Sequence, residues 1–273
     1  MSAHAPVAAF FDLDKTIIAT SSAFAFGKEF FKGGMITRQE AWEISLSKAQ
    51  YMLVGQSSEK MDTTRDTLAQ MVAGWEVEDI QRITRETLRE VVAPAIYAEA
   101  RELIAAHKDA GHHVIIISAS AKILVEPIAQ ELGVDTVVAT EMAVKDGRLT
   151  GEVTRYLKGG AKAEAVRQFA AEHHFDLDAS YAYSDSATDI PMLELVGHPV
   201  AFNPDRALKK HALANGWQAR TFKNPEPLIQ MPHAREVGVG AGVIAGVTAL
   251  AVAGVFIARA VGGKGSDDKR HSA

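Results

Sequence analysis

Short apolar runs alternate with amphipathic segments along most of the chain, and this alternation predicts an α/β fold. Residues 7–11 are apolar and rich in aromatic and branched side chains, as expected for a buried strand. Further strands are expected over 112–120, 136–140, 181–185 and 198–203, with helices over 95–111, 121–133, 159–174, 189–197 and 205–216. Strands that alternate with helices predict a Rossmann-like, mainly parallel sheet covered on both faces.

Two segments depart from this alternation. Residues 18–92 contain few strand-like runs and much helical spacing, so we expect a helical cap inserted after the first strand. The catalytic core then comprises residues 1–17 and 93–232, with Pro94 near the return to it. Residues 142–153 predict a hairpin, because Asp146-Gly147 suits a turn with positive φ.

The composition excludes several function classes. The net charge of -5 and the lack of a basic run ahead of the C-terminus argue against nucleic-acid binding. The chain has no cysteine, which rules out disulfides, thiolate zinc sites and a cysteine nucleophile. The opening MSAHAP does not resemble a secretory signal, so we expect the catalytic part on the cytoplasmic side.

The segment from Val237 to Ala258 has 22 residues and no charge, which is long enough to cross a membrane as a helix. Gly238, Gly242 and Gly246 would form a seam on one helix face, through which two copies could pair. With the short charged tail 259–273, the segment predicts a C-terminal anchor on the cytoplasmic face of the cell membrane. A helix lying in the membrane interface is the alternative.

Two acids follow the first predicted strand. Asp12 and Asp14 stand at i and i+2, so in an extended chain both side chains point the same way, and Lys15 points away. Such carboxylates repel unless a cation lies between them or one of them is protonated. A hard divalent ion such as Mg²⁺, which prefers oxygen ligands, would relieve the repulsion.

Other polar groups follow later strands. Asp185 and Asp189 form a second acidic pair, Ser118 ends the strand after the cap, and Lys162 follows two glycines at a helix start. In parallel sheets ligands bind at the carboxyl ends of the strands, so these groups are expected to meet there. Metal, lysine and serine around a carboxylate suit phosphoryl transfer through an aspartyl-phosphate.

These motifs, in this order, resemble the haloacid dehalogenase superfamily of phosphatases, and in particular its phosphoserine-phosphatase-like branch. The matching stretches are DLDKT, SAS at Ser118, GGAK at Lys162 and SDSATDIPML at Asp185 and Asp189. The resemblance covers roughly residues 7–230 and implies a magnesium-dependent phosphomonoester hydrolase with a cap over its site.

The resemblance also implies a role for each matching residue. Asp12 would be the nucleophile and Asp14 the general acid/base. Mg²⁺ would be held by Asp12, by the backbone carbonyl of Asp14 and by Asp185, with Asp189 in a supporting role. The phosphoryl group would be held by Thr16, Ser118 and Lys162.

Some positions keep simpler interpretations. Lys158 competes with Lys162 for the phosphate role, and Ser120 is expected to cap the helix that follows it. His112 and His113 are expected at the surface or the core edge, and Asn203 is expected to set a turn before Pro204.

The substrate is less determined than the chemistry. Phosphoserine phosphatases carry a glutamate nine residues after the nucleophile, where this chain has Ser21, and Thr188 replaces a usual asparagine. Ala23, Phe24 and Phe26 make the expected cap entrance apolar, which together with the predicted anchor favours a less polar phosphomonoester such as a lysophospholipid or a glycerol-phosphate-type headgroup. The expected substrate is therefore a small phosphorylated metabolite or a lipid-type phosphate. The alternatives are a phosphoserine phosphatase, a phosphotransferase using the same intermediate, and a non-catalytic membrane-bound protein built on the fold.

Overall fold

The structure is a computed structural model, and it describes residues 5–37 and 69–222. The predicted anchor at 237–258, its glycine seam and the tail 259–273 lie outside the described residues, as do residues 223–232 of the expected core. Within the described part, no helix has both the length and the apolar character that crossing a membrane requires.

A single sheet organises the described residues, and it has seven strands in the order β4-β3-β2-β1-β5-β6-β7. Every pairing is parallel except that of β3 with β4. The strands are β1 (Ala8–Phe11), β2 (His113–Ala121), β3 (Thr136–Lys145), β4 (Arg148–Arg155), β5 (Tyr181–Ser184), β6 (His198–Phe202) and β7 (Gln218–Arg220). The predicted parallel α/β fold is therefore confirmed.

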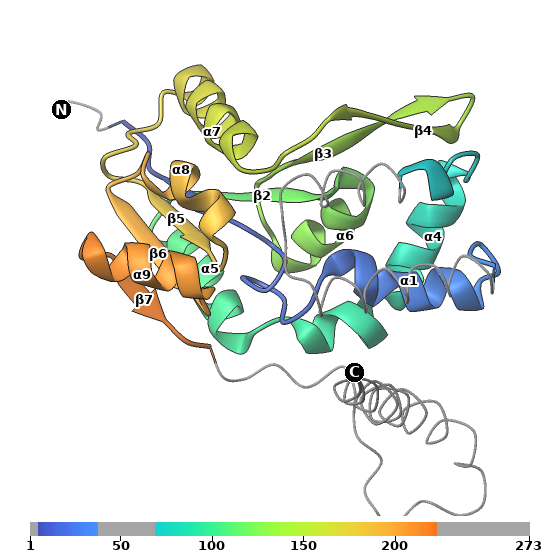
Figure 1. Ribbon diagram of the computed structural model, residues 1–273, viewed down its shortest axis with the longest axis horizontal. Helices are drawn as coiled ribbons and strands as arrows, with labels where there is room; N and C mark the ends of the chain where they lie inside the picture. Colours follow the sequence, from blue (N-terminus) through green and yellow to red (C-terminus); the bar gives the residue numbers. More distant parts are fainter. Residues whose placement is uncertain (1–4, 38–68, 223–273) are drawn as a thin grey trace, which may run out of the picture. The chain divides into compact units, whose positions relative to one another are not determined.

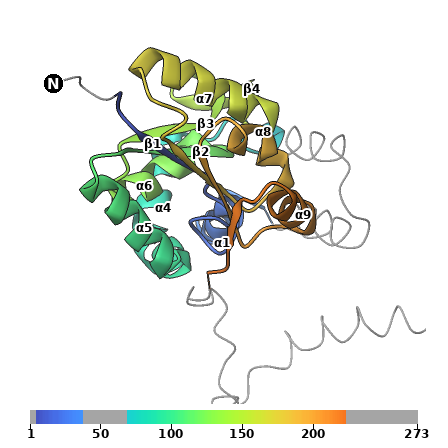
Figure 2. The same ribbon diagram turned by 90° about the vertical axis from the view of Figure 1, so that its left-hand side faces the viewer.

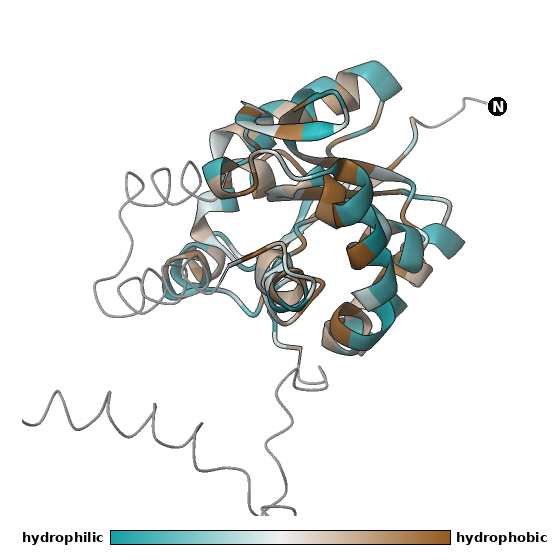
Figure 3. Ribbon diagram, turned by 90° about the vertical axis from the view of Figure 1, so that its right-hand side faces the viewer, coloured by the Kyte–Doolittle hydropathy of each residue, from teal (hydrophilic) through white to brown (hydrophobic). Residues whose placement is uncertain are grey.

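Two groups of helices cover the sheet on opposite faces (Figure 2). The first group is α1 (Ser22–Lys32), α4 (Val77–Thr87), α5 (Ala98–Asp109) and α6 (Lys122–Leu132). The second group is α7 (Gly160–His173), α8 (Ile190–Leu193) and α9 (Arg206–Ala214). Figure 3 shows hydrophilic and hydrophobic residues on the same helices, as expected for helices that bury one face against a sheet.

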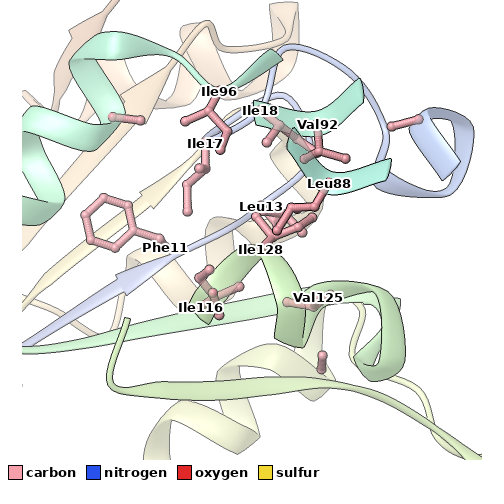
Figure 4. Packing of buried hydrophobic residues seen from close by; sticks show 14 of the residues in the cluster. Phe11, Leu13, Ile17, Ile18, Leu88, Val92, Ile96, Ile116, Val125 and Ile128 are labelled. Atoms are coloured by element: carbon pink, nitrogen blue, oxygen red, sulfur yellow. The ribbon is translucent and has the colours of Figure 1, made fainter. Parts of the chain in front are cut away.

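Strand alternation divides the core into two clusters. Phe11 and Ile116 point to the α5 and α6 side, while Phe10 and Ile115 point to the α7 side. Figure 4 shows Phe11, Ile116 and Ile128 of α6 in one buried cluster with Leu13, Ile17 and Ile18, the apolar residues that follow β1. The two faces together exclude water from the strands that carry the site.

The segment between β1 and α5 was expected to be a separate cap. Its described residues include α1 and α4, followed by a π-helical turn (Leu88–Val92) and a 3₁₀ turn (Ala93–Ala95). Val92 is fully buried in the same core cluster as Phe11 (Figure 4). The domain boundary at 92 stays a prediction, since the described residues share one core.

One expectation about the cap entrance is wrong. Phe26 was expected to make that entrance apolar, but its side chain is fully buried in the core cluster, close to Phe30. Helix periodicity explains this, since α1 turns Phe26 and Phe30 to one face. Ala23 is exposed, as the expected entrance requires.

The predicted hairpin is β3–β4, and Asp146 and Gly147 both have positive φ (51° and 76°). Figure 1 shows it extending past α6 toward α4. Its tip pairs with the start of α4, since the N–H of Val77 donates to the carbonyl of Gly147 at 2.9 Å and Glu76 forms a β-bridge with Arg148. The local sequence pattern did not predict this long-range pairing. It also did not predict β7, whose residues are mostly polar and are exposed at the edge of the sheet.

Candidate active site

The central strands of the sheet bring the predicted residues together. The strand β1 lies between β2 and β5, parallel to both, and Phe11 is in register with Ile116 and Tyr183. Asp12 therefore leaves the sheet at the same edge as Ser118 and Asp185, as the sequence predicted. The backbone N–H of Asp12 still donates to the carbonyl of Tyr183 at 2.9 Å, which fixes the position of the acid against β5.

A buried cluster of three charged side chains lies at this edge. The Nζ of Lys162 donates to Oδ1 of Asp12 at 2.6 Å and to Oδ2 of Asp189 at 2.7 Å. The exposed fractions are 7% for Asp12, 3% for Lys162 and 2% for Asp189. Two carboxylates share one ammonium group, so the cluster carries one excess negative charge when all three groups are ionised.

Burial and the neighbouring charges change the proton affinity of this cluster. Burial raises the pKa of Asp12 to about 7, although the Lys162 ammonium acts in the opposite direction. Burial alone would lower the pKa of Lys162, but Asp12 and Asp189 together raise it, so this ammonium stays charged. Lys162 is thus a permanent positive charge beside Asp12. Because Asp189 shares the same ammonium group, Lys162 neutralises only part of the negative charge of the two carboxylates.

The position of Lys162 follows from the local sequence. Gly159 has φ of 55°, a conformation that favours glycine, and it turns the chain into α7. Lys162 then lies in the first turn of α7, and its neighbours Ala163 and Ala165 are small and buried. Lys162 is therefore the lysine in the acidic cluster, while Lys158 lies before the helix begins.

Two buried hydroxyl groups lie at the same edge. Thr16 Oγ1 donates to Oδ2 of Asp12 at 3.3 Å, and Ser118 Oγ accepts from the N–H of Ser120 at 3.1 Å. Both side chains are 1% exposed. Because Ser118 Oγ is an acceptor in that bond, its own proton remains available to a ligand oxygen.

Asp14 has partners of its own. Its Oδ1 accepts from the N–H of Ser22, the first residue of α1, at 2.8 Å, and its Oδ2 accepts from Ser120 Oγ at 2.7 Å. The expected helix-capping role of Ser120 is wrong, because α6 begins after Ala121 without a side-chain cap. Asp12 and Asp14 therefore follow one strand but are held by separate sets of groups.

Lys15 does not point away from the site as strand alternation implied. Its φ is 64°, so the chain turns between Asp14 and Thr16 and the two-residue period no longer holds. The Lys15 ammonium lowers the pKa of Asp185, although burial is the larger influence and raises that pKa to about 6. Lys15 thus contributes positive charge on the Asp185 side.

The loop after β5 is held by residues that the sequence interpretation passed over. Ser184 Oγ donates to Oδ2 of Asp189 at 2.8 Å. Asp205 accepts from the N–H of Leu208 at 2.7 Å, capping α9, and from the N–H of Ala187 at 2.8 Å. An aspartate before an amphipathic helix is a capping signal, so the first role of Asp205 could have been predicted.

The remaining minor expectations are confirmed. Asn203 sets a turn after β6: its φ is 44°, and its Oδ1 accepts from the N–H of Phe222 at 3.0 Å. His112 and His113 are half-buried at the start of β2.

The residues fit a magnesium ion. Across the described residues, no three His, Cys, Asp or Glu side chains form a metal-binding group. The implied ligand set needs only two carboxylates, Asp12 and Asp185, and the carbonyl of Asp14. These donors are all oxygens, as Mg²⁺ prefers, and a cation would compensate the excess negative charge beside Lys162.

Comparison with known proteins supports this picture. The family model of haloacid dehalogenase-like hydrolases matches residues 9–194. A probable phosphatase of Mycobacterium tuberculosis is 46% identical over 258 residues, which cover 93% of this chain and 89% of the relative. The phosphoserine phosphatase SerB1 of the same species is 34% identical over 242 residues, covering 87% of this chain and 79% of the relative.

A histidinol-phosphatase of Neisseria meningitidis is 31% identical over 221 residues, covering 79% of this chain and 98% of the relative. Among solved structures, a protein of unknown function from Bordetella pertussis superposes with a TM-score of 0.70 at 26% identity. That match covers 79% of this chain and 98% of the other.

Proposed function

The chain belongs to the haloacid dehalogenase-like hydrolase family and is a phosphatase, and we propose that it hydrolyses phosphomonoesters through an aspartyl-phosphate formed on Asp12. The observation that carries the proposal is the buried contact of 2.6 Å between Lys162 Nζ and Oδ1 of Asp12. It places a permanent cation beside a carboxylate at the edge where Thr16 and Ser118 lie.

The first half-reaction transfers the phosphoryl group to the protein. A carboxylate oxygen of Asp12 bonds to phosphorus, and the bond between phosphorus and the ester oxygen breaks. Asp14 gives its proton to the departing oxygen, which leaves as an alcohol. Lys162, Thr16 and Ser118 donate hydrogen bonds to the phosphoryl oxygens and stabilise their negative charge.

The second half-reaction returns Asp12 to its starting state. Asp14, now a carboxylate, takes a proton from water, whose oxygen bonds to phosphorus while the Asp12–phosphorus bond breaks. Inorganic phosphate leaves, and Asp14 is protonated again. Magnesium held by Asp12, Asp185 and the Asp14 carbonyl would supply further charge neutralisation at the phosphoryl group.

The substrate we propose is a small phosphorylated metabolite. Two relatives with similar sequence identity to this chain are named as a phosphoserine phosphatase and a histidinol-phosphatase. Membership of the family therefore does not determine which alcohol the phosphoryl group is removed from. The segment 18–27 has no acidic residue to meet an amino group, and Ser21 stands where phosphoserine phosphatases carry glutamate. We therefore expect phosphoserine not to be strongly preferred. Because Phe26 is buried in the core, the case for a lipid-type phosphate rests on the predicted anchor.

We further propose that residues 237–258 anchor the protein to the cytoplasmic face of the cell membrane. The support is the uncharged 22-residue segment itself. Ile244→Lys with Val247→Lys would make insertion costly, so the variant should move from the membrane to the soluble fraction. An unchanged distribution between the two fractions would contradict the anchor.

The enzymatic proposal is tested by phosphate release from a panel of phosphomonoesters with and without Mg²⁺. Asp12→Asn removes the nucleophile and should lower kcat by at least about 10³-fold. Asp146→Asn is the matched control, because this carboxylate lies at the exposed hairpin tip and asparagine tolerates its positive φ. Full magnesium-dependent activity in Asp12→Asn would refute the assignment.

Phosphotransferase activity is the competing function. Acid-quenched protein should carry a hydroxylamine-sensitive acyl phosphate in both cases. In a hydrolase, inorganic phosphate should equal the alcohol released even when an alcohol acceptor is added. A phosphorylated acceptor formed in place of inorganic phosphate would indicate transfer instead.

A further inference from the structure

We propose that Ser120 is a positioning residue for Asp14, and that together with Ser22 it ties this acid to the start of helix α1. The inference rests on the proposed function, since it gives Asp14 the proton transfer. It gives a role to Ser120, a residue to which the family resemblance assigned none.

Asp14, Ser22 and Ser120 form a closed ring of hydrogen bonds. Ser120 Oγ donates to Oδ2 of Asp14 at 2.7 Å, and the N–H of Ser22 donates to Oδ1 at 2.8 Å. Ser22 Oγ in turn donates to Ser120 Oγ at 2.8 Å. Because the two carboxylate oxygens are held from different elements, the plane of the carboxylate cannot rotate freely.

A bulge in β2 explains why Ser120 reaches Asp14. The pairing of β2 with β3 shifts from Ser118 opposite Ala139 to Ala121 opposite Thr140, so two residues of β2 are left without a partner on β3. Bulges of this kind re-aim side chains next to functional sites. Thr140 Oγ1 fixes the bulge by donating to the carbonyl of Ala119 at 2.7 Å.

The site gives Ser118 and Ser120 different tasks, although they are two residues apart. Ser118 Oγ accepts from the N–H of Ser120, and the Ser118 side chain is buried at the edge of the sheet where Asp12 also lies. Ser120 Oγ has Asp14 and Ser22 as its partners and leaves α6 uncapped. The geometry thus directs Ser118 toward the phosphoryl group and Ser120 toward the acid that moves the proton.

The chemistry predicts which substrates will respond. When the bond between phosphorus and the ester oxygen breaks, that oxygen needs the Asp14 proton more as its basicity increases. Phenolate is more basic than p-nitrophenolate, whereas the two phosphate esters have similar size and charge. A misplaced Asp14 should therefore slow phenyl phosphate more than p-nitrophenyl phosphate.

The experiment measures kcat and KM for both esters with the full-length protein and Mg²⁺. Ser120→Ala should lower kcat for phenyl phosphate by about 10-fold or more and for p-nitrophenyl phosphate by less than about 3-fold, with KM nearly unchanged. Ser120→Thr keeps the hydroxyl and should restore most of the lost rate. Asp14→Asn removes the proton transfer completely, so its ratio of kcat values for the two esters is the reference for the largest expected change.

Two further variants separate positioning from a general loss of a buried hydroxyl. Ser180→Ala removes a buried hydroxyl that accepts from the N–H of Ala8 at 3.0 Å, at the end of β1 opposite to Asp14, so the ratio of the two rates should stay at the wild-type value. Ser22→Ala keeps the N–H donor and should shift the ratio in the same direction as Ser120→Ala, by a smaller factor. If Ser120→Ala does not fold, the ratio in Ser22→Ala decides the question.

Equal losses for both esters in Ser120→Ala, or the same ratio change in Ser180→Ala, would overturn the proposal. An unchanged ratio in Ser22→Ala would do so where Ser120→Ala is not folded. Failure of the proposed function looks different, because Asp12→Asn would then retain activity toward both esters.

Discussion

Two buried polar clusters adjoin strands β1 and β5. One of them contains charged side chains, and the other is neutral. The catalytic cluster at the strand ends buries Asp12, Asp189 and Lys162, and it carries one excess negative charge when all three are ionised. The second cluster lies on the α5 face, where His107 Nε2 is 2.7 Å from the Tyr183 hydroxyl and His107 Nδ1 is 2.8 Å from Nδ1 of His112. Burial lowers the pKa of His107 to about 4, so this second cluster contains a neutral histidine near pH 7.

Tyr183 belongs to both regions. Its carbonyl accepts from the N–H of Asp12 at 2.9 Å, and its ring stacks on Phe11 with centroids 4.4 Å apart. Its hydroxyl belongs to the neutral cluster. Buried charged groups are thus found where a cation and a phosphoryl group are expected to bind. In the His107 cluster, the buried polar atoms form hydrogen bonds with one another and carry no net charge.

The largest expected effect comes from removing the only cation of the catalytic cluster within the described residues. Lys162→Met leaves Asp12 and Asp189 buried without a counter-charge, so the free energy of unfolding should fall by about 3–5 kcal/mol. Without the cation, kcat should also fall by about 10³-fold. Lys122→Met is the control, since its 4.0 Å pair with Glu126 is exposed and should contribute less than about 0.5 kcal/mol. A similar stability loss in both variants would contradict the contrast between the clusters.

The second prediction is a dependence of stability on pH that comes from the neutral cluster. The folded pKa of His107, about 4, lies below its ordinary 6.5. The unfolded chain therefore binds the proton first as pH falls. The stabilisation is complete above pH 6.5 and is lost as the pH falls through 4, by about 3 kcal/mol in total.

Denaturant unfolding between pH 4 and pH 7 checks this prediction, with His107→Gln as the comparison. Glutamine can still bond to the Tyr183 hydroxyl but does not titrate, so its stability should change less over this range. If the free energy of unfolding changes equally with pH in wild type and His107→Gln, His107 is not the cause of the pH dependence.

The smallest predicted effect isolates the hydroxyl that Tyr183 gives to the neutral cluster. Tyr183→Phe leaves His107 Nε2 without its buried partner, which should cost about 1–2 kcal/mol of stability. The ring and the backbone carbonyl remain, so kcat should stay within about 2-fold of wild type at 25 °C. A large loss of kcat in a folded variant would mean that the two regions are not separable.

Most of the fold and most of the site could be predicted from local patterns. The strands at Val114–Ile117 and Tyr181–Ser184 are short buried runs, and parallel strands place their carboxyl ends at one edge. That rule places Asp12, Ser118 and Asp185 at the same edge, and the position of β1 between β2 and β5 makes them neighbours. The hairpin was predictable too, since Asp146-Gly147 specifies its turn.

Tertiary structure decided the features that depend on contacts far apart in sequence. The bulge after Ser118 exists through the pairing of β2 with β3, and it turned an expected helix cap into a partner of Asp14. Packing buried Phe26, and the left-handed backbone at Lys15 reversed a prediction that assumed an extended chain. The sequence by itself determined which groups reach the catalytic edge, because the end of each strand and the polar residues that follow it are local features of the chain. Only the folded chain decided which of those groups touch, because a hydrogen bond depends on distances that local periodicity does not set.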